Sequence, residues 1–163
     1  MLYTSSEANK LIRTLRTQEV SLRNGTSRVA TYTVGLNEEV VKPDYDFIET
    51  EKEIEEIQRK IRKIKHAINI FNLSTKVDGL NMSIDELLVA LPQWTDKLGT
   101  YTRMKNRLAK TRKSYNGNVE YECINYDLKE VEEAYNALSQ KITDAQTKLD
   151  LINNTQRFEI DVW

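Results

Sequence analysis

Cysteine, proline and glycine are all scarce in this chain of 163 residues, which has one cysteine, two prolines and five glycines. The single cysteine, Cys123, has no second cysteine in the chain with which to form a disulfide, so a disulfide-stabilised secreted scaffold is excluded. Few prolines and glycines mean few helix breakers and few tight turns, which argues against a sandwich or barrel of many short strands. These absences favour long helices.

Long apolar runs and an excess of charge of one sign are also missing. No stretch approaches the roughly 18 apolar residues of a transmembrane helix, and the first ten residues lack a basic segment followed by an apolar run. The formal net charge is −1, whereas a protein that binds nucleic acid through its phosphates usually carries a clear positive excess. We therefore expect a cytoplasmic protein whose partners include neither nucleic acid nor a membrane.

The residues that most often carry catalysis or hold metals are equally sparse. The chain has one histidine, His66, so a zinc site would need carboxylates for most of its ligands. The Glu-x-x-His motif of di-metal helical bundles is absent, as are glycine-rich phosphate loops, a nucleophile elbow and a Cys-x-x-Cys pair. We predict a non-enzymatic protein with no catalytic residue, no metal and no cofactor.

What the sequence does contain is a helical pattern, with hydrophobic residues at 39% and charged residues at 30%. Apolar residues recur at spacings of three and four in three long segments, which is typical of helices that pack through one seam. The first segment covers about residues 45 to 72. The second begins at Ser83 and the third at Asp127, each followed three residues later by the glutamate of a capping box. Pro92 lies inside the second segment, where we expect a kink rather than a restart.

The remaining elements are shorter. Thr4 and Glu7 have capping-box spacing and predict a helix that ends near Asn24 and Gly25. Residues 29–34, 119–123 and 158–162 alternate like β-strands. We predict one mainly α domain over residues 1–163, an antiparallel long-helix bundle with coiled-coil-like seams and a small β-sheet at one end. In it, residues 1–43 supply the N-terminal helix and a β-like segment, and residues 44–163 supply the long-helix core.

Several stretches of the chain resemble the septicolysin-like family, small helical proteins of uncertain function in bacteria and their phages. The resemblance lies in residues 68–72 with Thr75 and Gly79, in residues 83–88, in residues 119–127, and in residues 149–153, and it covers roughly residues 45 to 163. It implies a fold rich in helical hairpins. The family name implies a cytolysin, but this sequence has no long apolar segment and no helix with an obviously lipid-facing side.

A basic run near the middle of the chain is the strongest candidate for a ligand site. Arginine provides fork-shaped donors for phosphate or carboxylate, and tyrosine can stack on a base or cover a cation. The candidate ligand-binding residues of this run and its flanks are Arg103, Arg107, Arg112, Tyr115 and Tyr121. The alternative is that the run is neutralised by the acidic residues within 49–56 and 130–133, which is the usual fate of surface charge.

Two asparagines beside the first seam, Asn69 and Asn72, are further candidates. Burying an amide costs a few kcal/mol unless it is hydrogen-bonded, so these residues either line a pocket or cap a helix end and fix helix register.

These patterns lead to two hypotheses for function. The first is a homo-oligomeric protein that binds a small anionic, nucleotide-like ligand; for a phage-encoded family member, sequestering a host signalling nucleotide would be the corresponding anti-defence role. The second is a structural or adaptor protein that recruits a protein partner through its helical seams.

Overall fold

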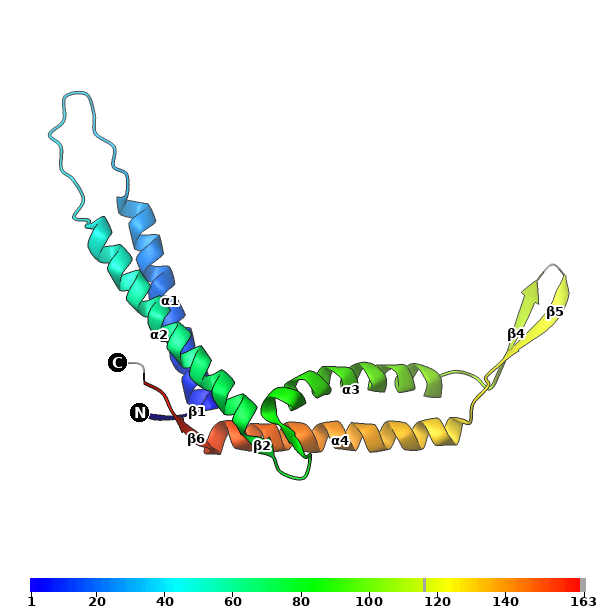
Figure 1. Ribbon diagram of the computed structural model, residues 1–163. Coiled ribbons are helices and arrows are strands. Elements are labelled where there is room, and N and C mark those ends of the chain that lie inside the picture. The colour runs from blue at the N-terminus through cyan, green and yellow to red at the C-terminus, as the bar shows by residue number, and fades with distance from the viewer. Residues whose placement is uncertain (116, 162–163) are drawn as a thin grey trace. The chain divides into compact units, whose positions relative to one another are not determined.

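The computed structural model describes residues 1–115 and 117–161, and these residues form a mainly α protein (Figure 1). The helices are α1 (Ser5–Val29), α2 (Phe47–Ser74), α3 (Ile84–Lys105) and α4 (Leu128–Thr155). The strands are β1 (Leu2–Thr4), β2 (Lys76–Val77), β3 (Met82–Ser83), β4 (Lys110–Tyr115), β5 (Asn118–Cys123) and β6 (Arg157–Glu159). The predicted fold class, mainly α with a small β component, is confirmed.

The chain divides into two compact units. The first contains Met1–Asn72 together with the C-terminal segment from Ile152, and the second contains Leu73–Leu151.

In the first unit α1 and α2 pack side by side as an antiparallel hairpin (Figure 1). The capping box between Thr4 and Glu7 that the sequence predicts begins α1. One apolar stripe of each helix, together with Ile160, forms a buried core. The buried members are Ala8, Ile12, Leu15, Ile61, Ile64 and Ile160.

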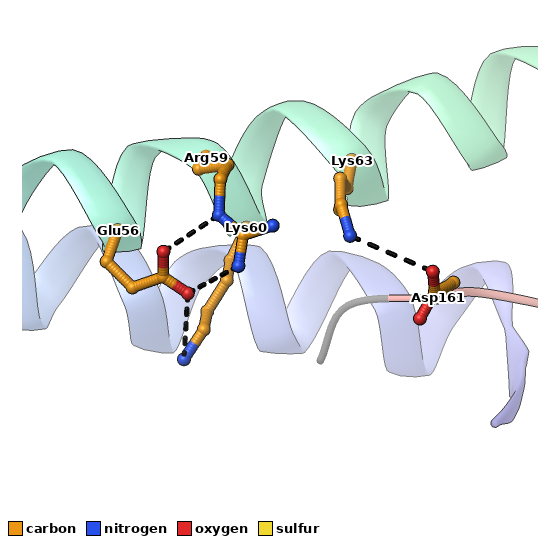
Figure 2. A network of polar contacts seen from close by, with 5 residues as sticks. All are labelled: Glu56, Arg59, Lys60, Lys63 and Asp161. Carbon is orange, nitrogen blue, oxygen red and sulfur yellow. Dashed lines mark hydrogen bonds and ion pairs between the residues drawn. The ribbon is translucent and has the colours of Figure 1, made fainter.

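The C-terminal segment closes this core. Strand β6 pairs antiparallel with β1, and the ring of Phe158 stacks on that of Phe71 with centroids 4.5 Å apart. On α2, Glu56 pairs with Arg59 and Lys60, and Lys63 reaches Asp161 with an Nζ–Oδ2 distance of 3.8 Å (Figure 2). Of these pairs, the one between Lys63 and Asp161 joins α2 to the C-terminal segment, and the Asp161 side chain is 86% exposed. An exposed ion pair adds little stability, so the apolar contacts carry most of the attachment.

The second unit begins with the short hairpin β2–β3 and continues as α3 and α4, which run antiparallel (Figure 1). The turn before α3 contains Gly79, whose φ of 72° is left-handed, and Lys148 Nζ donates to the Asp78 carbonyl at 2.8 Å. The predicted capping box of Ser83 and Glu86 begins α3. The buried apolar residues of this unit are Val77, Ile84, Leu87, Val131, Ile142, Ala145 and Leu149.

Burial along the α3 seam decreases away from the β2–β3 end. Ile84 and Leu87 are buried, whereas Trp94 and Tyr101 further along α3 are half-buried. Lysine side chains cover part of the aromatic surface here: Lys141 Nζ lies 4.1 Å from the Trp94 ring centroid. Helix α3 continues through Pro92 rather than restarting after it.

Two sequence predictions about the N-terminal region are wrong. Helix α1 does not end at Asn24 and Gly25 but continues to Val29, and residues 30–34 form no strand. The helical bond from Ala30 N to the Thr26 carbonyl, 2.8 Å long, extends the helix past the glycine. A strand needs a neighbouring strand to satisfy its backbone, and no strand pairs with residues 30–34 in the described part of the chain.

The β residues also differ in arrangement from a single sheet at one end. They form three separate antiparallel pairs, β1–β6, β2–β3 and β4–β5. Two of these are hairpins between consecutive helices, and the third joins segments from the two ends of the sequence.

Candidate functional site

The β4–β5 hairpin connects α3 to α4, and its two faces carry different kinds of side chain. The register places Arg112 opposite Tyr121 and Lys113 opposite Glu120. Because alternate residues of a strand point to opposite faces, directly paired residues share a face. One face, which we call the cationic face, therefore carries Lys110, Arg112, Ser114, Val119, Tyr121 and Cys123.

The cationic face combines positive charge with an accessible aromatic ring. Lys110 Nζ lies 4.0 Å from the centroid of the Tyr121 ring, a cation–π contact. Val119 and Tyr121 are 50% and 54% exposed, so apolar surface lies beside the cations. None of the described residues that share this face is acidic. Such a surface suits an anion with a flat or apolar part.

The opposite face holds the acidic residues of β5. Lys113 Nζ forms a salt bridge with Glu122 Oε2 at 2.9 Å, and Glu120 lies opposite Lys113 in the ladder. The hydrogen bond from Lys113 lowers the pKa of the Glu122 carboxyl, and the positive charge of Arg107 lowers it further. Within the hairpin, Lys113 therefore offsets one of the two acids on this face.

A cavity of about 620 Å³ lies at the base of the hairpin. Tyr126 Oη donates to the Met104 carbonyl at 2.8 Å, and Ile124 N donates to the Ala109 carbonyl at 3.2 Å, which ties the connections to α3 and α4 together. The cavity is lined by Arg107, Leu108, Thr111, Glu122, Cys123, Ile124, Asn125 and Tyr126.

The residues predicted from the basic run are brought together only in part. Arg112 and Tyr121 are cross-strand partners, and Arg107 lines the basal cavity, where Glu122 is its acidic neighbour. Arg103, in the last turn of α3, donates to Thr100 Oγ1 at 3.0 Å. The side chain of Tyr115 lies outside the described residues.

The asparagine candidates belong to the other unit. Asn69 and Asn72 lie on α2, and Asn69 lines a groove between α1 and α2 with a volume of about 640 Å³. The groove is lined by Ser6, Asn9, Lys10, Ile12, Arg13, Arg16, Lys65, Ile68, Asn69 and Asn154.

Sequence reasoning missed the four cations of this groove, Lys10, Arg13, Arg16 and Lys65. One signal was present: Asn9, Arg13 and Arg16 are spaced at i, i+4 and i+7, which places them along one face of a helix. The contribution of Lys65 depends on how α1 packs against α2, which the sequence pattern does not specify.

Within residues 1–115 and 117–161, no three histidine, cysteine or carboxylate side chains lie close enough together to hold a metal ion. No helix in the same ranges combines the length and the apolar character needed to cross a membrane.

Comparison with models of protein families, with curated proteins and with solved structures finds no match to this chain. The resemblance to the septicolysin-like family therefore remains a hypothesis based on the sequence.

Proposed function

We propose that this chain is a non-enzymatic, homo-oligomeric binding protein that holds a small anionic, nucleotide-like ligand on the cationic face of the β4–β5 hairpin. The observation that carries the proposal is the separation of charge: the acids of β5 lie on one face, and Lys110 and Arg112 lie with Tyr121 on the other.

This separation bears on whether the basic run is merely neutralised. Glu122 pairs with Lys113, but both residues lie on the face opposite Arg112. Arg112 therefore retains a donor fork for phosphate or carboxylate, and Tyr121 next to it offers a ring on which a base can stack. Arg107 lies in the basal cavity, where its positive charge interacts with Glu122. A second anionic group of the ligand would therefore have to compete with Glu122 for Arg107.

Neighbouring residues of β4 provide a matched test. Arg112→Ala should lower the amount of ligand that copurifies with the protein, and Arg107→Ala with Arg112→Ala should abolish it. Lys113→Ala removes an exposed cation from the same strand but from the opposite face, and it should retain the ligand. The readout is the molar ratio of released ligand to protein after denaturation, measured by mass spectrometry. Equal ratios in the Arg112 and Lys113 variants would place the ligand elsewhere.

If the septicolysin-like resemblance reflects common ancestry, a phage-encoded member would use such a site to sequester a host signalling nucleotide. That role requires binding without turnover, which is consistent with the sparse catalytic chemistry of the sequence.

The adaptor function is favoured by a different observation. Leu88 and Val89 on α3 are 46% and 60% exposed, and the seam of the same helix is only half-buried beyond Leu91. A partner helix could cover this surface by packing its apolar face against α3. Recovery of one stoichiometric protein partner, lost on changing Leu88 and Val89 to Ser, would favour this function over ligand binding.

A further inference from the structure

We propose that the groove between α1 and α2 in the first unit is a second binding site, which takes a small ligand carrying two or more phosphate groups. This inference does not rest on the function proposed for the hairpin, because the two sites share no residue.

The first argument is the charge of the groove. It is lined by four cations and no acidic residue: Lys10, Arg13 and Arg16 come from α1, and Lys65 comes from α2. Four like charges in one groove repel each other, and an anion bound there removes that repulsion.

The cations of the groove are available to bind an anionic ligand. In the described part of the chain, Arg13 and Lys65 form no salt bridge. The acid nearest in sequence to Arg16 is Glu19, whose Oε1 already accepts hydrogen bonds from Gln58 at 2.8 Å and from Arg23 at 3.2 Å.

The acid near Lys10 is likewise engaged. Glu7 Oε2 accepts a hydrogen bond from Thr4 N at 2.9 Å in the capping box of α1, and its other carboxylate oxygen lies 3.8 Å from Arg157. The charges of Lys10 and Arg16 act on Glu7 and Glu19, but in the described part of the chain neither cation forms a salt bridge with these acids.

Other surfaces of the same helical hairpin show a different pattern. A second groove in this unit is lined by Arg23, Lys52 and Arg62 but also by Glu51 and Glu55, which offset two of the three positive charges. On the side of α2 drawn in Figure 2, the lysines likewise have acidic partners: Lys60 contacts Glu56, and Lys63 contacts Asp161. An acid-free cluster is thus a particular feature of the α1–α2 groove.

The helices of the groove hold its residues in fixed positions before a ligand binds. The groove residues of each helix share a face, since Asn9, Arg13 and Arg16 follow i, i+4, i+7 spacing and Lys65 and Asn69 follow i, i+4 spacing. The two helices that carry these residues pack together through the buried core, which includes Ile12. The backbone positions of the groove residues are therefore fixed before a ligand binds, and only the exposed lysine and arginine side chains must be ordered on binding.

The ligand class follows from the size and lining of the groove. A volume of about 640 Å³ lies within the range of small-molecule sites. Guanidinium and ammonium groups match phosphate oxygens, while the side chains of Ile12 and Ile68 and the amides of Asn9 and Asn69 can contact an organic moiety. A nucleoside diphosphate or triphosphate has this combination of groups.

Isothermal titration calorimetry with ATP, inorganic pyrophosphate and adenosine tests the proposal. ATP and pyrophosphate should bind and compete with each other, and adenosine should not bind. Arg13→Ala combined with Lys65→Ala should weaken ATP binding about tenfold or more, because two charge-assisted contacts are lost. The control, Arg28→Ala with Arg62→Ala, also removes one cation from each helix but leaves the groove intact, and its affinity should match the wild type.

Circular dichroism should show that both double variants keep the helical content of the wild type. Absence of saturable ATP and pyrophosphate binding up to about 1 mM, the weak end of specific binding, would overturn the proposal. So would equal losses in both double variants, or a clear preference for an RNA oligomer over ATP. Loss of ATP binding in Arg112→Ala but not in Arg13→Ala with Lys65→Ala would reject the groove and leave the hairpin site standing.

Discussion

At the scale of single residues, neighbours in one strand have different roles. Arg112 and Lys113 are adjacent in β4, yet one lies with Tyr121 on the cationic face and the other pairs with Glu122. The sequence pointed to Arg112 and Tyr121 as candidates from residue type alone. It could not give their pairing, because that depends on the hairpin register, and the register is set by a turn that includes Gly117 with a φ of 81°.

The capping-box glutamate Glu86 should make the stability of the protein depend on pH. The backbone N–H of Ser83, the Ser83 hydroxyl and then Lys76 lower the pKa of Glu86 below its ordinary value of 4.5. A carboxyl with a lowered pKa in the folded state stabilises fully above its unfolded pKa and loses that contribution as pH falls through the folded pKa. Glu86→Gln should therefore destabilise the protein at pH 7 and have a smaller effect at about pH 3, because the wild-type carboxylate loses its contribution as the pH falls through its lowered folded-state pKa.

Urea unfolding at the two pH values measures this difference. Glu132→Gln on the exposed side of α4 is the control, and its effect should be small at both pH values. A Glu86→Gln effect that does not change with pH would show that the charge of the carboxylate contributes nothing to the cap.

At the scale of elements, the seams were the most predictable feature. Seam spacing gave α2 close to its observed bounds, and the capping box of Ser83 and Glu86 gave the start of α3, because both signals are local in sequence. Helix α4 begins at Leu128, directly after the predicted Asp127. Strand β5 also followed from alternation, whereas β4 did not, because its run of basic residues resembles a charged helix end more than a strand. The predicted end of α1 was wrong because a glycine often ends a helix but does not have to.

Gly25 tests the observed course of α1. It lies inside the helix, is exposed, and has no atom within 4 Å of where a Cβ would stand. Gly25→Ala should raise the free energy of unfolding by about 0.5–1 kcal/mol, because alanine loses less backbone entropy in a helix. Gly117→Ala, at a φ of 81°, should lower it. A destabilising Gly25→Ala change, measured by urea unfolding, would mean that the helix ends at this glycine.

At the scale of the whole molecule, the non-local features were the ones that sequence could not supply. The pairing of β1 with β6 joins segments from the two ends of the sequence, and the α1–α2 groove gathers Arg13 and Lys65 across more than fifty positions. The sequence also gave no sign that Asn69 and Asn72 belong to one compact unit and the arginine and tyrosine candidates to the other. Local sequence patterns do not specify contacts between residues that lie far apart in the chain.

The central claim is that this chain works by binding a small anionic ligand as an oligomer. Native mass spectrometry of the wild-type protein, purified gently from the cells that naturally produce it, tests this most directly. The spectrum should show an oligomer with a discrete additional mass below about 1 kDa, the scale of a pocket ligand, which denaturation releases unchanged. A bare monomer mass, with no small molecule released on denaturation, would contradict it.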